Sequence, residues 1–195
     1  KLLWSITFLL TLTSSFFAGH LQIFFYLYVL TIIYFLARWL QFQHKIKPFL
    51  LFIILNSLFL LLTSAQWLPT LQFIQLSGRD IDQIAFQTEG WFLPAQHLIQ
   101  FFAPDFFGNP ATLNYWGVWN YAEFIGYIGL APLIFVFFAV FFRKDKKTLF
   151  FSIATVIASV FAFDSIVAKV PYILNIPFIS TAQPTRLLSI ICFCF

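Results

Sequence analysis

The chain has 195 residues, of which 61% are hydrophobic and 9% are charged, and its formal net charge is +4 at pH 7. A soluble domain carries about 25% charged residues, so this composition excludes a water-soluble globular protein. The basic residues gather beside apolar runs instead of covering one polar face, which argues against a nucleic-acid partner. The class predicted is an all-α polytopic membrane protein.

Apolar runs of helical length follow one another along the chain. A helix needs about 20 such residues to cross the hydrocarbon core of a bilayer. Because the first and last runs are shorter than a full span, we expect a single transmembrane domain, residues 1–195, from inside a longer protein. A secretory signal is the competing interpretation of the first run. About six transmembrane helices are predicted, at residues 2–17, 23–40, 49–68, 124–142 and 149–163 and from 187 onward.

Glycine and proline mark the ends and contacts of these spans. Gly19 allows a tight turn after the first span, and Pro69 is expected to end the third. In the fourth span, Gly126 and Gly129 allow close approach of a neighbouring helix, and Pro132 predicts a kink.

Charge predicts the orientation of the spans. Lysine and arginine favour cytoplasmic turns, and residues 70–123 and 164–186 together hold six of the seven acidic residues and only three basic ones. We therefore expect a long extracytoplasmic loop over 70–123 and a second extracytoplasmic segment over 164–186. The turns expected in the cytoplasm carry Arg38, Lys45, Lys47, Arg143, Lys144, Lys146 and Lys147.

The long loop is expected to contain a short interfacial helix at residues 92–102. On a helix, Gln96, His97 and Gln100 share one face, while Leu98 and its apolar neighbours lie largely elsewhere. His97 is a candidate substrate-binding residue, because a histidine can donate to a phosphate or shuttle protons. The alternative is an ordinary polar residue at the membrane interface.

Two carboxylates are candidate catalytic residues. Asp105 lies in a turn set by Pro104 and Gly108, where phenylalanines make the surroundings apolar. It could act as a base with a raised pKa or bind a cation, or it could cap its own backbone in an Asx-turn. Glu123 stands where the loop re-enters the membrane, so it should lie at the interface or face a wet cavity.

The remaining candidates would bind an anionic substrate. Arg186 begins the last span on the outer side, where it needs an anionic partner, either a lipid phosphate or a loop carboxylate. Gln183 belongs to the same segment. Arg79 stands near Asp80 and could bind a phosphate or belong to a solvated charge cluster. His20, on the first outer turn, could likewise donate to a phosphate.

Several short segments resemble the YfhO-like bacterial membrane proteins. They are residues 14–22 (SSFFAGHLQ), residues 64–70 (SAQWLPT), Pro184-Thr185-Arg186, the turn at 104–108, and Tyr121 with the Gly126-Tyr127-Ile128-Gly129 re-entry. That family is grouped with the GT-C glycosyltransferases, which have many spans and an active site on the outer face. The resemblance implies a place in the bacterial cytoplasmic (inner) membrane. It also implies transfer of a sugar from a polyprenyl-phosphate carrier to an extracytoplasmic glycan or cell-envelope acceptor.

In residue terms, the resemblance implies that Arg186 and His20 hold the carrier phosphate. The usual catalytic acid of the superfamily would lie upstream of Lys1, and Asp105 or Glu123 would be a second carboxylate. A carboxylate would deprotonate the acceptor hydroxyl while cationic groups stabilise the departing lipid phosphate. A divalent cation is left open as a cofactor. The alternative is a non-catalytic membrane protein, either a lipid-linked-sugar transporter or an envelope-assembly scaffold.

Overall fold

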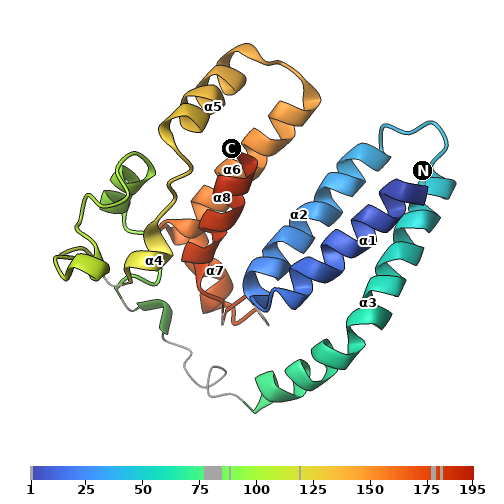
Figure 1. Cartoon of the computed structure of the whole chain (residues 1–195), viewed down its shortest axis with the longest axis horizontal. Coiled ribbons are helices and arrows are strands. Elements are labelled where there is room, and N and C mark those ends of the chain that lie inside the picture. The colour runs from blue at the N-terminus through green and yellow to red at the C-terminus, as the bar shows by residue number, and fades with distance from the viewer. Residues whose placement is uncertain (1, 77–84, 88, 119, 177–178, 181) are drawn as a thin grey trace. The chain divides into compact units, whose positions relative to one another are not determined.

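A computed structural model describes residues 2–76, 85–87, 89–118, 120–176, 179–180 and 182–195. Its contacts divide the chain into two compact units, Lys1–Asp80 and Ile81–Phe195. Throughout the described residues the regular elements are helices, and one isolated β-bridge joins Leu93 to Phe163 (Figure 1). The predicted all-α class is therefore confirmed.

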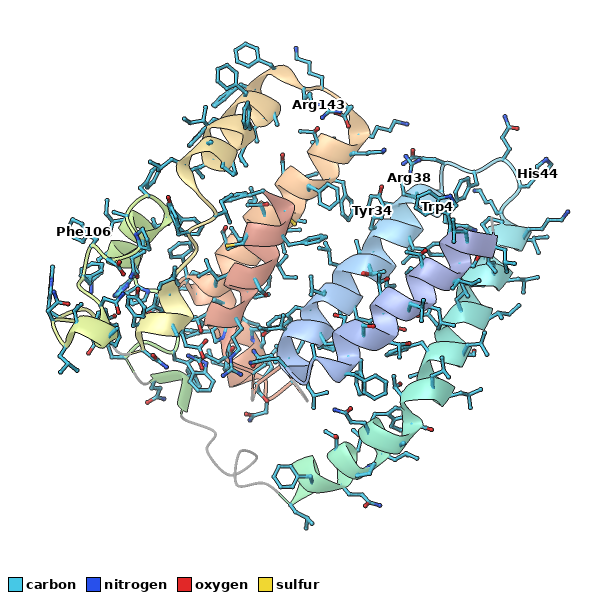
Figure 2. The ribbon with its side chains drawn as sticks, in the orientation of Figure 1. Trp4, Tyr34, Arg38, His44, Phe106 and Arg143 are labelled. Atoms are coloured by element: carbon cyan, nitrogen blue, oxygen red, sulfur yellow. The ribbon has the colours of Figure 1, made fainter. Side chains whose placement is uncertain are left out.

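Three consecutive helices form the first unit: α1 (Leu2–Phe17), α2 (Leu21–Trp39) and α3 (Ile46–Gln75). Gly19 has a φ of +89°, the left-handed conformation that glycine adopts without strain, which confirms the predicted turn. The start of α1 lies at the same end of this unit as the α2–α3 turn (Figure 1). Trp4, Arg38 and His44 are labelled at that end in Figure 2.

The interior of the first unit is largely aromatic. Phe16 and Phe59 are buried with Leu12, and the Phe16 ring meets the rings of Phe24 and Phe59 edge-on at 5.2 and 5.8 Å. Edge-to-face pairs of this kind contribute about 0.5–1.5 kcal/mol beyond the area they bury. Tyr28 donates to Asn56 Oδ1 at 2.6 Å, so a polar contact also joins α2 to α3.

Pro69 does not end the third helix. The prediction was wrong here, because α3 continues through Pro69 to Gln75. A proline inside a helix removes one hydrogen bond and crowds the carbonyl four residues earlier, but a helix can continue where nearby groups, such as serine or threonine side chains, bind backbone carbonyls. Thr70 Oγ1 donates to the carbonyl of Gln66 at 2.7 Å in this turn. The interval at 70–123 therefore begins as helix.

Two helices among the described residues are long and apolar enough to cross a membrane, over Leu21–Trp39 and Ile46–Phe73. In the most apolar 18-residue stretch of each helix, only 11% and 17% of the residues are buried, whereas a core helix of a soluble protein would be mostly buried. The other apolar helices are shorter. The structure thus gives two candidate spans where the sequence predicts about six.

In the second unit, α6 (Lys146–Ala162) packs against both α8 (Leu188–Cys194) and η5 (Pro184–Leu187). The helix α5 (Leu130–Phe142) reverses into α6 at the turn that carries Arg143 (Figures 1 and 2). Asp145 caps α6 by accepting from the backbone N–H groups of Lys147 and Thr148. The Thr148 hydroxyl, which donates to Asp145 Oδ2 at 2.8 Å, and then these backbone bonds lower the pKa of Asp145 to about 2. The elements are η2 (Ala85–Gln87), η3 (Ala95–Phe101), η4 (Pro110–Thr112), α4 (Tyr121–Phe124), α5 (Leu130–Phe142), α6 (Lys146–Ala162), α7 (Ile166–Ile173), η5 (Pro184–Leu187) and α8 (Leu188–Cys194).

The predicted fourth span is interrupted. It divides into the short helix α4, an extended stretch, and α5, which begins after Gly129 at a φ of +101°. Pro132 lies in the first turn of α5, where its missing N–H removes no helical bond, so the expected kink is not needed. Gly126 does allow close approach: a Cβ there would lie 2.6 Å from Phe101 Cε1.

We expect Gly126→Ala to lower the free energy of unfolding by about 1–3 kcal/mol, because the added methyl would displace the buried Phe101 ring. Thermal unfolding in detergent, followed by tryptophan fluorescence, measures the change. Phe101→Leu should partly restore stability in the Gly126→Ala background. Gly19→Ala is the matched control, since nothing lies within 4 Å of that position and only its positive φ opposes a side chain. If Phe101→Leu restored stability equally in the Gly126→Ala and Gly19→Ala proteins, the contact between position 126 and the Phe101 ring would be contradicted.

Candidate functional site

Four predicted site residues meet around α4, a helix of four residues, Tyr121-Ala122-Glu123-Phe124. Asn120 starts it, because its side-chain oxygen accepts from the backbone N–H of Ala122 at 3.3 Å. Three side chains of α4 contact three other segments. Tyr121 binds Asp105, Glu123 binds Arg186, and Phe124 packs on His97.

Glu123 and Arg186 form an ion pair. Arg186 Nη2 lies 3.3 Å from Glu123 Oε1, and the two side chains are only 17% and 22% exposed. Thr185, which is fully buried, donates to the other carboxylate oxygen, Glu123 Oε2, at 3.4 Å. Of the two partners predicted for Arg186, the structure shows the loop carboxylate. The pair joins α4 to η5 and neutralises both charges.

Asp105 is exposed and is oriented by two side chains. The Tyr121 hydroxyl donates to Asp105 Oδ1 at 2.5 Å, and Asn109 Nδ2 donates to the same oxygen at 3.1 Å. Within the described residues, Oδ2 has no hydrogen-bond partner. The hydrogen bond to Asp105, followed by burial, raises the pKa of Tyr121 above its ordinary value. The Asx cap in this turn is made by Asn109, whose Oδ1 accepts from the N–H of Ala111 at 2.8 Å.

His97 is fully buried, so the predicted interfacial helix is wrong in its orientation. The segment is the 3-10 helix η3, in which His97 and Gln100 face inward and Leu98 is 46% exposed. Three residues make one 3-10 turn, so positions 97 and 100 stack on one face. The His97 ring lies between those of Phe107 and Phe124, with centroids 4.5 and 4.6 Å away.

Hydrogen bonds explain why these two polar side chains are buried. His97 Nδ1 lies 2.6 Å from Gln100 Oε1, and Gln100 Nε2 donates to the carbonyl of Pro104 at 2.9 Å. The second bond orients the amide, so Nδ1 is the donor in the first. His97 Nε2 is buried and has no partner within the part of the chain that is described. His97 thus supports the turn before Asp105 from inside.

Three predicted site residues remain: His20, Gln183 and Arg79. His20 is exposed in the first unit, where its Nδ1 caps α2 by accepting from the N–H of Ile23 at 3.4 Å. Gln183 is half-buried and precedes η5, and its carbonyl accepts from the N–H of Arg186 at 3.4 Å. Arg79 lies outside the described residues. Where side chains are described, no group of three or more His, Cys, Asp or Glu residues is placed to hold a metal ion.

Sequence reasoning missed four contributors to this site: Tyr121, Asn109, Thr185 and Gln100. Local signals existed for two of them. Asn109-Pro110 is typical of a capped turn, and Gln100 follows His97 at helical spacing. Tyr121 binds Asp105, which lies 16 positions away in the sequence, and Thr185 binds Glu123, which lies 62 positions away. No local sequence pattern reveals partners at such distances.

Comparison with known proteins identifies no family for this geometry. No known protein-family profile, curated protein sequence or solved structure matches the chain. The resemblance to YfhO-like proteins is therefore a prediction from short motifs, and function has to be argued from the site.

We expect Glu123→Ala and Arg186→Ala each to lower the free energy of unfolding by about 2–4 kcal/mol, because either change leaves an unpaired charge largely buried. The double variant should lose less than the sum, with a coupling of about 1 kcal/mol or more. Denaturant unfolding of the four proteins in detergent measures the cycle.

The exposed pair Arg143–Asp145 provides the control. Arg143 Nε lies 3.0 Å from Asp145 Oδ2, and the two side chains are 73% and 40% exposed, so solvent screens this pair and its coupling should be small. A coupling for Glu123 and Arg186 no larger than that of the control would show that the buried pair does not join α4 to η5.

Titration of Tyr121 tests its bond to Asp105. The folded state raises the pKa above 10.0, so the stabilisation from this phenol is complete below pH 10 and is lost as pH rises through the raised pKa. Asp105→Asn should move the pKa back down, because the main cause of the shift is removed. The difference in phenolate absorbance between each protein and its Tyr121→Phe counterpart isolates this residue. Asp145→Asn should leave the titration unchanged, and a shift as large as that of Asp105→Asn would contradict the assignment.

Proposed function

We propose that the chain is part of a GT-C-type membrane glycosyltransferase that transfers a sugar from a polyprenyl-phosphate-linked donor to an extracytoplasmic acceptor. One observation carries the proposal: Asp105 is exposed and held through Oδ1, while Oδ2 faces away from those bonds. A carboxylate oriented in this way is suited to accept the proton of an acceptor hydroxyl.

A multi-pass arrangement in the bacterial cytoplasmic membrane belongs to the same proposal. In it the six apolar segments cross the bilayer, with the α2–α3 and α5–α6 turns in the cytoplasm and α4 outside. The basic residues of those turns support this orientation. In this arrangement α5, whose 13 residues measure about 20 Å, would separate the depth of the Arg143 turn from that of α4.

Arg186 has a supporting part in this mechanism. A guanidinium has five N–H donors, so it can keep one bond to Glu123 and still present others to a phosphate oxygen. Glu123 balances that charge before the substrate arrives. The developing negative charge on the leaving phosphate would then be stabilised by a group already fixed in place.

The second candidate function is a scaffold or a lipid-linked-sugar transporter without catalysis. It is favoured by the pairing of Glu123 with Arg186, which joins α4 to η5 and gives both residues a structural purpose. The two proposals differ at Asp105, which a scaffold does not require.

The test is turnover of a radiolabelled polyprenyl-phosphate sugar by the protein reconstituted in vesicles, read as release of polyprenyl phosphate. We expect Asp105→Asn to lower the rate by about 10²–10⁴-fold, because the proton acceptor is removed while the size of the side chain is kept. Asp145→Asn, on the α5–α6 turn, should keep the wild-type rate, since asparagine also caps a helix. An unchanged rate in Asp105→Asn, or no turnover by the wild type, would favour the scaffold.

A further inference from the structure

A cavity of about 370 Å³ lies in the second unit, away from the contacts of α4. Small-molecule sites usually measure about 300–1,000 Å³, so this cavity suits a small ligand. One wall comes from the segment before η3 and the other from the corner between α6 and α7. The lining side chains used below are Phe86, Gln87, Glu89, Phe92, Asp164 and Lys169.

The aromatic wall is held firmly. Phe92 is 5% exposed, and Tyr172 packs against both Phe92 and Phe86, with ring centroids 5.6 and 5.5 Å apart. The next residue, Leu93, donates its N–H to the carbonyl of Ala162 at 2.8 Å. The backbone of the wall is thereby tied to the end of α6. A ligand would meet surfaces that are already in place.

The polar groups of the cavity are arranged around Lys169. Its ammonium lies 2.6 Å from Asp164 Oδ1 and 5.9 Å from the centroid of the Phe92 ring. Glu89 and Gln87 are exposed on the facing segment. Together these groups present carboxylate and amide acceptors beside ammonium and amide donors.

The balance of charge selects the class of ligand. Two carboxylates, Glu89 and Asp164, outweigh the one ammonium, so a phosphate or a carboxylate would be repelled. A cationic ligand would compete with Lys169, which already occupies the position near Phe92. A neutral ligand rich in hydroxyl groups meets neither objection.

We propose that this cavity binds an uncharged sugar ring. The C–H face of the sugar would pack on Phe86, the half-buried ring of the wall, because the face of a π-system is negative and attracts C–H groups. Phe92 is buried beneath Lys169 and supports Phe86 through Tyr172. The hydroxyl groups would donate to Glu89 and Asp164 and accept from Lys169. The role as the holding site for the acceptor glycan rests on the proposed function, whereas sugar binding depends on the cavity alone.

The experiment titrates the purified protein in detergent with glucose, galactose and mannose, and with glucose 1-phosphate as the charged comparator, by saturation-transfer NMR. We expect saturable binding of at least one neutral hexose and weaker binding of the phosphate. Asp164→Asn and Glu89→Gln should each weaken hexose binding by about tenfold or more, because each removes a charged acceptor. Lys147→Met, on the α5–α6 turn, is the control and should bind as the wild type does.

Absence of saturable hexose binding would overturn the inference, as would unchanged binding in both carboxylate variants or tighter binding of the phosphate. Asp105→Asn separates this inference from the proposed function, because it should lose turnover and keep hexose binding. Turnover without hexose binding would reject the sugar cavity alone. Hexose binding without turnover by the wild type would reject the glycosyltransferase and leave a sugar-binding protein.

Discussion

The ion pair between Glu123 and Arg186 is the contact on which the second unit depends. Only 9% of the residues in this chain are charged, and these two are largely withdrawn from solvent. Breaking such a pair costs more than the pair contributes, because the charge left behind stays desolvated. The pair therefore fixes α4 against η5 across 63 positions of the sequence. Once α4 is fixed, Tyr121 orients Asp105 and Phe124 covers His97.

Those features of the fold that depend on neighbouring residues could be predicted from the sequence. The first helix and the turn at Gly19 follow from periodicity and from the backbone freedom of glycine. Features that depend on distant partners could not. His97 and Gln100 read as the polar face of an interfacial helix, but the carbonyl of Pro104 and two phenylalanine rings make burial of that face stable. The two alternatives for Arg186 stayed open because its partner lies on another segment.

The candidate site and the cavity proposed to bind a sugar are linked through η3. The cavity wall at Leu93 is tied to α6, and the N–H of His97 donates to the carbonyl of Pro94, one residue further along. His97 then packs on Phe124 of α4. A short, hydrogen-bonded segment with buried side chains transmits strain instead of absorbing it. The wall that would hold a sugar and the helix that orients Asp105 are thus parts of one packed structure.

The two carboxylates predicted from the sequence differ in their burial and in their hydrogen-bond partners. Glu123 is largely buried, shares its charge with Arg186 and accepts from Thr185, so a proton taken up there would break the contact between α4 and η5. Asp105 is exposed, and its hydrogen bonds converge on Oδ1, so a proton on Oδ2 would leave the turn intact. A general base must change its protonation state in every cycle without unfolding its surroundings. Under the proposed function, Asp105 is therefore the candidate general base, while the contacts of Glu123 join α4 to η5.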